Sequence, residues 1–229
     1  MKRMGQKQVN AMLESIEAEC RHTQGYTGIQ TFKPEVMAAI AKVPREEFVP
    51  KSLKAWAYEN EPLPIGNGQT ISQPFIVALM TDLLCPDKSD VILEVGTGSG
   101  YQAALLSQLV KKVYSLEIVP SLAVKAAQLL KKLGYENVEI RQGDASRGWP
   151  EYAPYAGIIV TAAASHVPVA LKKQLKPGGR LVIPIGRPQM AQDLLLIQKD
   201  KQGEFTSQNI LPVAFVPFTG ELTTGNNLE

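Results

Sequence analysis

The sequence is poor in cysteine, in net charge and in long hydrophobic runs, and each shortage excludes a class of protein. Its 229 residues include two cysteines, Cys20 and Cys85, which lie far apart and lack the spacing of metal ligands. We expect both to be free thiols rather than a disulfide, as in a reducing cytosol. A chain of this length can bury a core large enough to fold without disulfides or metals.

Positive and negative charges nearly balance, with 24 Lys and Arg against 22 Asp and Glu, a net charge of +2. No basic field is therefore available for strong binding to nucleic acid. No run of about eighteen apolar residues occurs, and the opening M-K-R-M-G-Q-K-Q leads into no apolar segment of signal-peptide length. We expect a soluble, cytoplasmic, monomeric protein with no nucleic-acid or membrane partner. Leu228 and Glu229 are interpreted as an expression-vector remnant and carry no weight.

The most informative stretch is V-I-L-E-V-G-T-G-S-G-Y, residues 91–101. Five aliphatic and β-branched residues predict a strand, Gly96, Gly98 and Gly100 predict a tight turn, and a helix is expected to follow. Glycine suits such a turn because it tolerates unusual backbone angles and because a side chain would keep a ligand away from the backbone. The helix directs its free N–H groups and the positive end of its dipole at the same place. The stretch therefore predicts a cofactor site.

Strands and helices are expected to alternate along most of the chain. The expected helices cover residues 9–20, 34–40, 75–84, 101–109, 121–133 and 168–175, and the expected strands cover residues 91–95, 112–117, 138–141, 156–161, 180–184, 194–199 and 210–216. Such alternation predicts an α/β fold with a doubly wound, mostly parallel sheet. The last two strands follow one another without a helix, so we expect a hairpin in which one strand runs antiparallel to the rest.

Three acidic residues indicate which cofactor the turn holds. Glu94 directly precedes the turn, where a carboxylate conflicts with a dinucleotide phosphate but not with a sulfonium cofactor that carries an ammonium group. Glu117 ends the next strand, where it can accept hydrogen bonds from ribose hydroxyls, a device shared by nicotinamide and S-adenosylmethionine proteins. Asp144 ends the third strand, where it can accept from an adenine amino group. Helix capping or solvation at a strand end is the alternative for Glu117 and Asp144.

A loop rich in hydroxyl and amide groups, G-N-G-Q-T-I-S-Q-P-F, precedes the helix expected from Phe75. In one interpretation Thr70 or Ser72 caps the free N–H groups of that helix. In the other, the loop contacts a polar substrate. The pattern alone favours the cap.

At this point several motifs resemble one family, the bacterial type of protein-L-isoaspartate O-methyltransferase. They are G-N-G-Q-T-I-S-Q-P, E-V-G-T-G-S-G-Y-Q-A, V-Y-S-L-E-I-V-P, G-D-A-S-R-G-W-P, V-T-A-A-A, L-K-P-G-G-R-L-V-I-P-I-G, V-P-R-E-E-F-V-P and F-V-P-F-T-G. The resemblance covers roughly residues 43 to 220, and the T-I-S-x-P segment makes it specific among methyltransferases. It implies a seven-stranded, Rossmann-like fold of the class I S-adenosylmethionine-dependent type with an N-terminal helical extension.

The resemblance also implies an activity. S-adenosyl-L-methionine is the implied donor, and the free α-carboxylate of an isoaspartyl residue in a damaged protein or peptide is the implied acceptor. The methyl ester then collapses to a succinimide without the enzyme. We expect residues 1–75 to supply helices and the active-site loop, and residues 76–229 to form the cofactor-binding domain.

Individual residues take roles by their positions in the matching motifs. Ser72 stands in the active-site position, where a hydrogen bond to the acceptor carboxylate suffices because a carboxylate is already ionised and needs no strong base. The resemblance outweighs the capping interpretation for Ser72. The residues expected around the cofactor are Gln69, Thr70, Ile71, Glu94, Gly96, Thr97, Gly98, Ser99, Gly100, Glu117, Asp144, Ala145 and Thr219.

Some alternatives remain open and others are weak. Ala145 and Ala156 stand where the family usually has glycine and aspartate, which leaves open a non-catalytic cofactor-binding or peptide-binding module, or another carboxylate acceptor. A nicotinamide dehydrogenase is the remaining enzyme alternative. The T-A-A-A run after the fourth strand lacks both the motif that grips a flipped base and the clustered carboxylates of a metal-dependent enzyme, so we expect no metal.

Overall fold

The computed structural model of the chain describes residues 5–187 and 190–220, so the expectation about Leu228 and Glu229 lies outside the described residues. The helices are α1 (Gln6–Thr27), α2 (Pro34–Lys42), α3 (Pro74–Leu84), α4 (Tyr101–Ser107), α5 (Pro120–Lys132) and α6 (Val169–Lys173). The strands are β1 (Leu63–Gly66), β2 (Gln69–Ile71), β3 (Val91–Val95), β4 (Lys112–Glu117), β5 (Val138–Gln142), β6 (Tyr155–Val160), β7 (Leu175–Ile185), β8 (Gln192–Lys199) and β9 (Phe205–Val213). Short 3-10 helices cover Arg45–Glu47, Lys51–Trp56, Ala145–Arg147 and Pro150–Tyr152.

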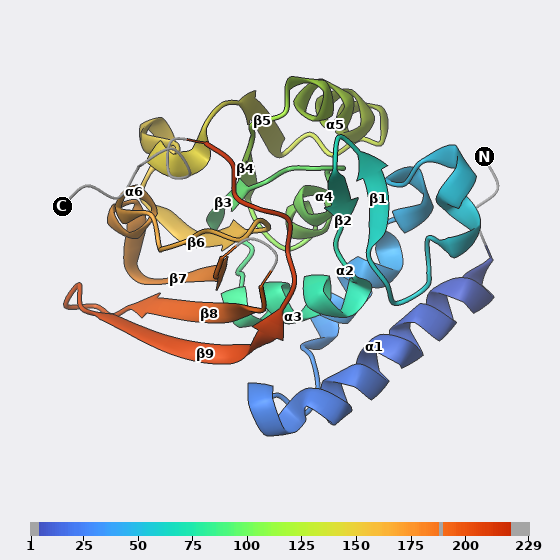
Figure 1. The fold of residues 1–229 in the computed structure, drawn as a ribbon, viewed down its shortest axis with the longest axis horizontal. Coiled ribbons are helices and arrows are strands. Elements are labelled where there is room, and N and C mark those ends of the chain that lie inside the picture. The colour runs from blue at the N-terminus through green and yellow to red at the C-terminus, as the bar shows by residue number, and fades with distance from the viewer. Residues whose placement is uncertain (1–4, 188–189, 221–229) are drawn as a thin grey trace.

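Seven strands form one sheet in the order β5-β4-β3-β6-β7-β8-β9, with helices on both of its faces (Figure 1). The strands from β5 to β7 pair in parallel, whereas β8 runs antiparallel to both β7 and β9. The predicted doubly wound, mostly parallel α/β sheet is confirmed, as is the antiparallel strand in the last pair. β1 and β2 form a separate two-stranded hairpin.

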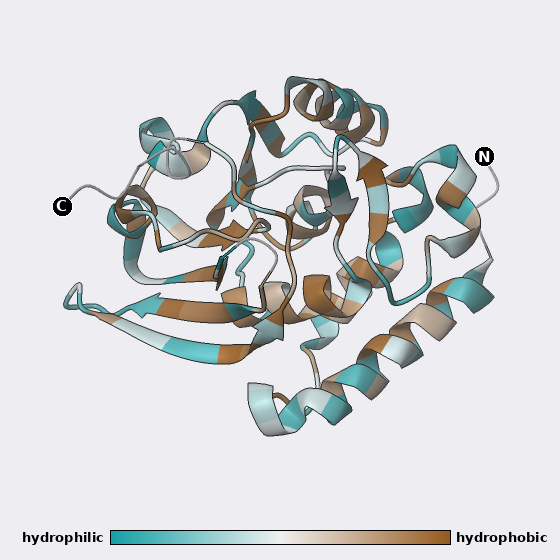
Figure 2. Cartoon of the chain, viewed as in Figure 1, coloured by the Kyte–Doolittle hydropathy of each residue, from teal (hydrophilic) through white to brown (hydrophobic). Residues whose placement is uncertain are grey.

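Successive side chains of a strand point to opposite faces of the sheet, and in the central strands the side chains on both faces are buried. In β3, Ile92 belongs to a hydrophobic cluster with α1 to α4, and Leu93 belongs to a second cluster on the other face. Figure 2 shows hydrophobic residues concentrated in the inner strands and in α3, whereas α1 has mixed colouring. The sheet is thereby fixed between two packed layers.

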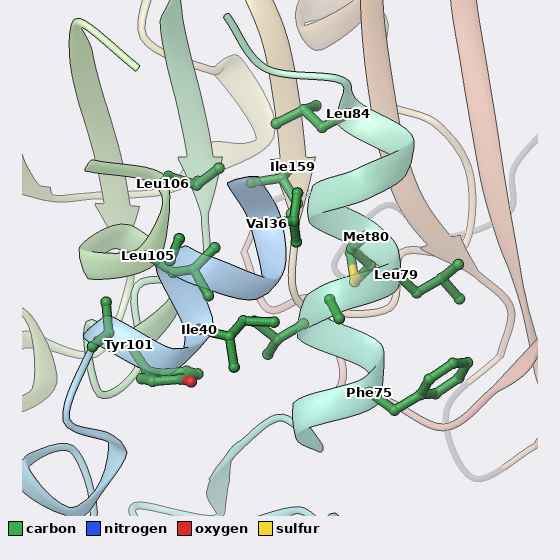
Figure 3. Close-up of a cluster of buried hydrophobic side chains, with 14 of the residues drawn as sticks. Val36, Ile40, Phe75, Leu79, Met80, Leu84, Tyr101, Leu105, Leu106 and Ile159 are labelled. Atoms are coloured by element: carbon green, nitrogen blue, oxygen red, sulfur yellow. The ribbon is translucent and has the colours of Figure 1, made fainter. Parts of the chain in front are cut away.

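The larger cluster joins the N-terminal helices to the sheet. Figure 3 shows Val36 and Ile40 of α2 among side chains of α3 and α4, with Ile159 of β6 beside them. In α1, Met12, Ile16 and Cys20 are buried at helical spacing. The N-terminal helices therefore share a core with the sheet.

Several element boundaries expected from the sequence are wrong. β7 begins at Leu175 rather than at residue 180, with a shift in its pairing to β6, and it therefore includes the Pro177-Gly178-Gly179 run. Since β7 begins early, α6 ends at Lys173. β9 covers 205–213 rather than 210–216, because the chain leaves the sheet after Val213.

Both cysteines are free, Cys20 buried and Cys85 exposed, which confirms the prediction of thiols. Among the described helices, none is both long enough and apolar enough to span a membrane.

Candidate functional site

The turn after β3 lies at the carboxyl ends of the parallel strands, where open α/β sheets bind ligands. Gly96, Gly98 and Gly100 all have positive φ angles, of 95°, 54° and 87°. The Gly96 amide donates to the Leu116 carbonyl of β4 at 2.8 Å, which ties the turn to the neighbouring strand. The predicted strand, turn and helix are therefore present.

The first glycine is required for two reasons. Its positive φ is a conformation that side chains disfavour, and a Cβ added at Gly96 would lie 2.6 Å from Thr161 Oγ1. Thr161, which follows β6, donates its hydroxyl to the Gly96 carbonyl at 2.6 Å. Gly100 has a different role, because its Cβ would contact Leu130 of α5 at 3.3 Å. Gly100 thus permits packing of the turn against α5.

Glu117 at the end of β4 organises the far side of the turn. Its Oε2 accepts from the Gly98 amide at 2.7 Å and its Oε1 accepts from the Val119 amide at 2.8 Å. Only 5 % of Glu117 is exposed, yet the residue lines the cleft described below. Each carboxylate oxygen has a second lone pair, so Glu117 can still accept from ligand hydroxyls.

Glu94 lies beneath the turn and is fully buried. The Ser115 hydroxyl donates to Glu94 Oε2, and Ser115 Oγ lies 2.5 Å from the hydroxyl of Thr97. Burial raises the pKa of Glu94 to about 8, and the nearby Glu117 carboxylate acts in the same direction. Glu94 does not line the cleft, so its contacts support the turn from below.

Asp144 makes the contacts expected of a cap. Its Oδ1 accepts from the Ser146 amide at 2.8 Å at the start of the 3-10 helix Ala145–Arg147. A Cβ on Gly220 would lie 2.5 Å from the same oxygen, so the C-terminal segment passes directly over Asp144. Ala145, not Asp144, is in the lining of the cleft.

The segment rich in hydroxyl and amide groups, residues 66–75, contains β2 and is held from behind by a buried arginine. Arg45 is fully buried, and its Nη2 donates to the Ser72 carbonyl at 2.7 Å. Its guanidinium lies 4.9 Å from the centre of the Tyr101 ring. Burial lowers the pKa of Arg45 from its ordinary value. The backbone of the loop is thereby fixed at Ser72.

The interpretation of Thr70 or Ser72 as an N-cap is wrong. α3 begins at Pro74, and its N-cap residue, Gln73, makes no side-chain capping bond. Instead, Asn60 Oδ1 accepts from the Phe75 amide at 2.9 Å. The Thr70 and Ser72 side chains are therefore not needed as caps.

A strap, residues 214–220, leaves the sheet after β9 (Figure 1), and its residues Val216 to Thr219 line the cleft described below. The Ala163 amide donates to the Val216 carbonyl, and the Phe218 amide donates to the Ala163 carbonyl, both at 2.8 Å. The buried side chain of Gln192 pairs with Phe215, accepting from its amide at 2.6 Å and donating to its carbonyl at 3.1 Å. The strap is thus attached to β8 and to the segment after β6.

These elements enclose a cleft of about 780 Å³, including its open mouth, which we term the glycine-turn cleft. The predicted site residues that line it are Gln69, Thr70, Ile71, Ser72, Gly96, Thr97, Gly98, Ser99, Glu117, Ala145 and Thr219. Glu94, Gly100 and Asp144 lie outside this lining.

Sequence reasoning missed many of the lining residues. They are Val77, Val95, Tyr101, Gln102, Leu116, Ile118, Val119, Gly143, Thr161, Ala162, Val216, Pro217 and Phe218. Ile118 and Val119 directly follow Glu117, and Thr161 directly follows β6, so the rule that ligands lie at strand carboxyl ends would have found them. Val216, Pro217 and Phe218 of the strap lie at no strand end, so this rule does not find them, because the position of the strap depends on contacts with Ala163 and Gln192.

A second cavity, the side groove, adjoins the glycine-turn cleft and has about 1480 Å³ of empty space, including open solvent. The two cavities share Thr70, Ser72, Thr161 and Val216. The rest of the side groove comes from Glu19 of α1, from Pro62, from Gln73 and the start of α3, from the end of β9 and the start of the strap, and from residues 190–192. Among the described residues, no cluster of His, Cys, Asp or Glu could hold a metal ion.

Comparison with known proteins places these features in one family. The family model described as protein-L-isoaspartate(D-aspartate) O-methyltransferase matches residues 21–223, which extends the match toward the N-terminus beyond the motifs found in the sequence. A protein-L-isoaspartate O-methyltransferase 2 of Syntrophobacter fumaroxidans is 56 % identical over 209 residues, 91 % of this chain and 85 % of the relative. One of Polaromonas sp. is 54 % identical over 210 residues, 92 % of this chain and 100 % of the relative.

Solved structures agree with this result. A structure described as a protein-L-isoaspartate O-methyltransferase has a TM-score of 0.77 and 30 % identity, and the match covers 92 % of this chain and 67 % of that chain. A putative enzyme of this kind from Plasmodium falciparum, in complex with S-adenosyl-L-homocysteine, has a TM-score of 0.74 at 23 % identity, covers 91 % of this chain and 97 % of its own, and supports the fold. Since the family model spans most of the sequence and the two relatives are more than half identical over 85 % and 100 % of their own length, this chain belongs to the protein-L-isoaspartate(D-aspartate) O-methyltransferase family.

Proposed function

We propose that the chain transfers a methyl group from S-adenosyl-L-methionine to the free α-carboxylate of L-isoaspartyl residues in damaged proteins and peptides, the first step of their repair. One observation carries the proposal: the glycine-turn cleft and the side groove share Thr70, Ser72, Thr161 and Val216. A transferase for two substrates needs such a junction, because the reacting groups must be held together in one orientation.

The glycine-turn cleft fits the donor. The glycines at 96 and 98 bring backbone close to a ligand, and the Glu117 carboxylate keeps free lone pairs at a position suited to a ribose diol. Ala145 and Gly143 lie where an adenine ring would be flanked. When bound, S-adenosyl-L-methionine supplies an electrophilic methyl group on a positively charged sulfur.

The protein's own residues position the acceptor rather than deprotonate it. An α-carboxylate is ionised at neutral pH, so a general base is unnecessary. Ser72 lines both cavities, and we propose that its hydroxyl donates a hydrogen bond to one carboxylate oxygen. Arg45 holds the Ser72 carbonyl, which fixes the backbone from which that hydroxyl projects. The strap excludes water from the junction.

We further propose that residues 1–75 act as helices and an active-site loop that complete a cofactor-binding domain formed by residues 76–229. We also propose that the protein works as a monomer in the cytoplasm. Light scattering at micromolar concentration tests the monomer, and fractionation of cells that express the chain tests the location.

The activity is tested by transfer of a labelled methyl group from S-adenosyl-L-methionine to an isoaspartyl peptide, beside the same peptide with normal aspartate. We expect base-labile label on the isoaspartyl peptide alone. In S72A the loss of one hydrogen bond to a charged group should lower kcat/KM about 10- to 100-fold. Binding of S-adenosyl-L-homocysteine should change little.

The exposed Ser52 provides a matched control, because S52A removes the same atom at a residue that lines neither cavity. An S72A enzyme as active as S52A would remove Ser72 from the proposal. If wild-type protein binds S-adenosyl-L-homocysteine and labels neither peptide, the chain is a binding module or acts on another acceptor.

A further inference from the structure

Glu19 of α1 connects the N-terminal helix to the active-site loop. Its Oε2 accepts from Asn60 Nδ2 at 2.6 Å and from Gln73 Nε2 at 2.9 Å. Gln73 directly follows Ser72, and Asn60 caps α3 through the Phe75 amide. One carboxylate oxygen therefore holds both partners that define the end of the loop.

The same side chain also belongs to the side groove. Among the described residues that line this groove, Glu19 is the only one with a charged side chain, and the others are apolar or neutral. Within the described structure Oε2 takes both amide hydrogen bonds, so Oε1 is not needed to hold Asn60 or Gln73. The groove therefore carries one negative charge close to the position of the acceptor.

The position of Glu19 on the helix explains why this charge reaches the groove. Met12, Ile16 and Cys20 form the buried side of α1, and Glu19 is half-buried beside them. Glu17, two positions earlier, is exposed on another face and lies 4.0 Å from Arg21. Glu17 and Glu19 carry the same charge and belong to the same helix, but of the two only Glu19 lines the side groove.

We propose that Glu19 is a specificity-determining residue that selects acceptors by the charge of residues flanking the isoaspartyl group. Its carboxylate attracts a lysine or arginine side chain of the acceptor into the side groove and repels an acidic one. This inference rests on the proposed function, since it assumes that the peptide continues from Ser72 into the side groove. Attraction between opposite charges is stronger in a partly buried groove than in open water.

The experiment uses three isoaspartyl peptides that differ at one flanking position, which is Lys, Gln or Glu, with each flank tested in turn. For wild-type protein we expect kcat/KM to follow the order Lys, Gln, Glu, with about a fivefold step for each change of charge. E19Q should retain an oxygen that accepts from Asn60 and Gln73 while losing the charge. The three peptides should then differ by less than about twofold with E19Q.

Two readouts separate a charge effect from a structural one. The wild-type preference should weaken as salt increases from about 0.05 M to 0.5 M, because salt screens charge but leaves packing intact. Affinity for S-adenosyl-L-homocysteine, measured by calorimetry, and the melting temperature should be similar in wild type and E19Q. E17Q is the matched control and should keep the wild-type preference, since Glu17 does not line the groove.

A charge-reversed variant, E19K, should favour the peptide with Glu. If wild-type protein methylates the three peptides equally at low salt, or if E19Q keeps the wild-type order, the inference is wrong and the proposed function stands. If wild-type protein methylates none of them, the proposed function itself fails.

Discussion

We expect the Gln192 side chain to hold the strap, residues 214–220, closed against β8. Its amide group pairs with both the N–H and the C=O of Phe215, and 3 % of the residue is exposed. Replacement by leucine keeps the approximate size and removes both hydrogen bonds. At about 1 kcal/mol for each, the strap loses about 2 kcal/mol of local stability, which raises its opening equilibrium roughly 30-fold.

Hydrogen exchange followed by mass spectrometry measures this opening directly. In Q192L, we expect amides of residues 215–218 to exchange about 30-fold faster than in wild type, while amides of the central strand β3 keep their rates. Affinity for S-adenosyl-L-homocysteine should fall, because Val216 to Thr219 line the glycine-turn cleft. Q198L is the control, since Gln198 lies in the same strand opposite Thr206, away from the strap.

The reasoning would be refuted by unchanged exchange in the strap of Q192L. Faster exchange throughout the protein would also contradict it, because that result would mean that Gln192 stabilises the whole sheet. If exchange rises and ligand affinity does not fall, the strap opens as expected but contributes nothing to ligand binding.

Three other substitutions test contacts of the glycine turn and of α3. G96A should reduce S-adenosyl-L-homocysteine affinity at least tenfold in calorimetry, because the added Cβ would lie 2.6 Å from Thr161 Oγ1 at a φ of 95°; near-wild-type affinity would contradict the geometry. N60A should lower the free energy of unfolding by about 1 kcal/mol in urea titration, since the Phe75 amide loses its cap, and an unchanged value would show that water replaces the cap. For Glu94, with its pKa raised to about 8, the native state binds more protons than the unfolded state between about pH 5 and pH 8. The free energy of unfolding of the wild type should therefore fall by a few kcal/mol at most as pH rises through this window. In urea titrations at pH 5, 6.5 and 8, E94Q should show a smaller fall. An equal dependence on pH in wild type and E94Q would show that Glu94 ionises normally.

The part of the fold that could be predicted depends on local patterns. Residues 91–101 determine strand, turn and helix by their own composition, and the structure shows them as β3, the glycine turn and α4. The end of β9 could not be predicted in this way. The run 210–216 has strand composition throughout, yet residues after Val213 leave the sheet because the strap pairs with Ala163 and Gln192.

The same distinction applies to the site. The sequence placed Glu117 correctly in the cleft, because a carboxylate at the end of a parallel strand has a defined position relative to the next turn. It gave no reason to expect Asn60 as the cap of α3, since fifteen positions separate Asn60 from Phe75. Arg45 behind Ser72 and Glu19 beside Gln73 depend on the same kind of contact between distant segments.

The side groove has a consequence for how the protein is made. It is bounded by α1 at one end of the described sequence and by β9 and the strap at the other. Contacts between such distant segments form late, because they require closure of a long loop. A growing chain can therefore assemble the glycine turn and its neighbouring strands before the side groove, our proposed acceptor site, is complete. With the acceptor bound as proposed, methyl transfer requires nearly the whole described sequence to be synthesised and folded.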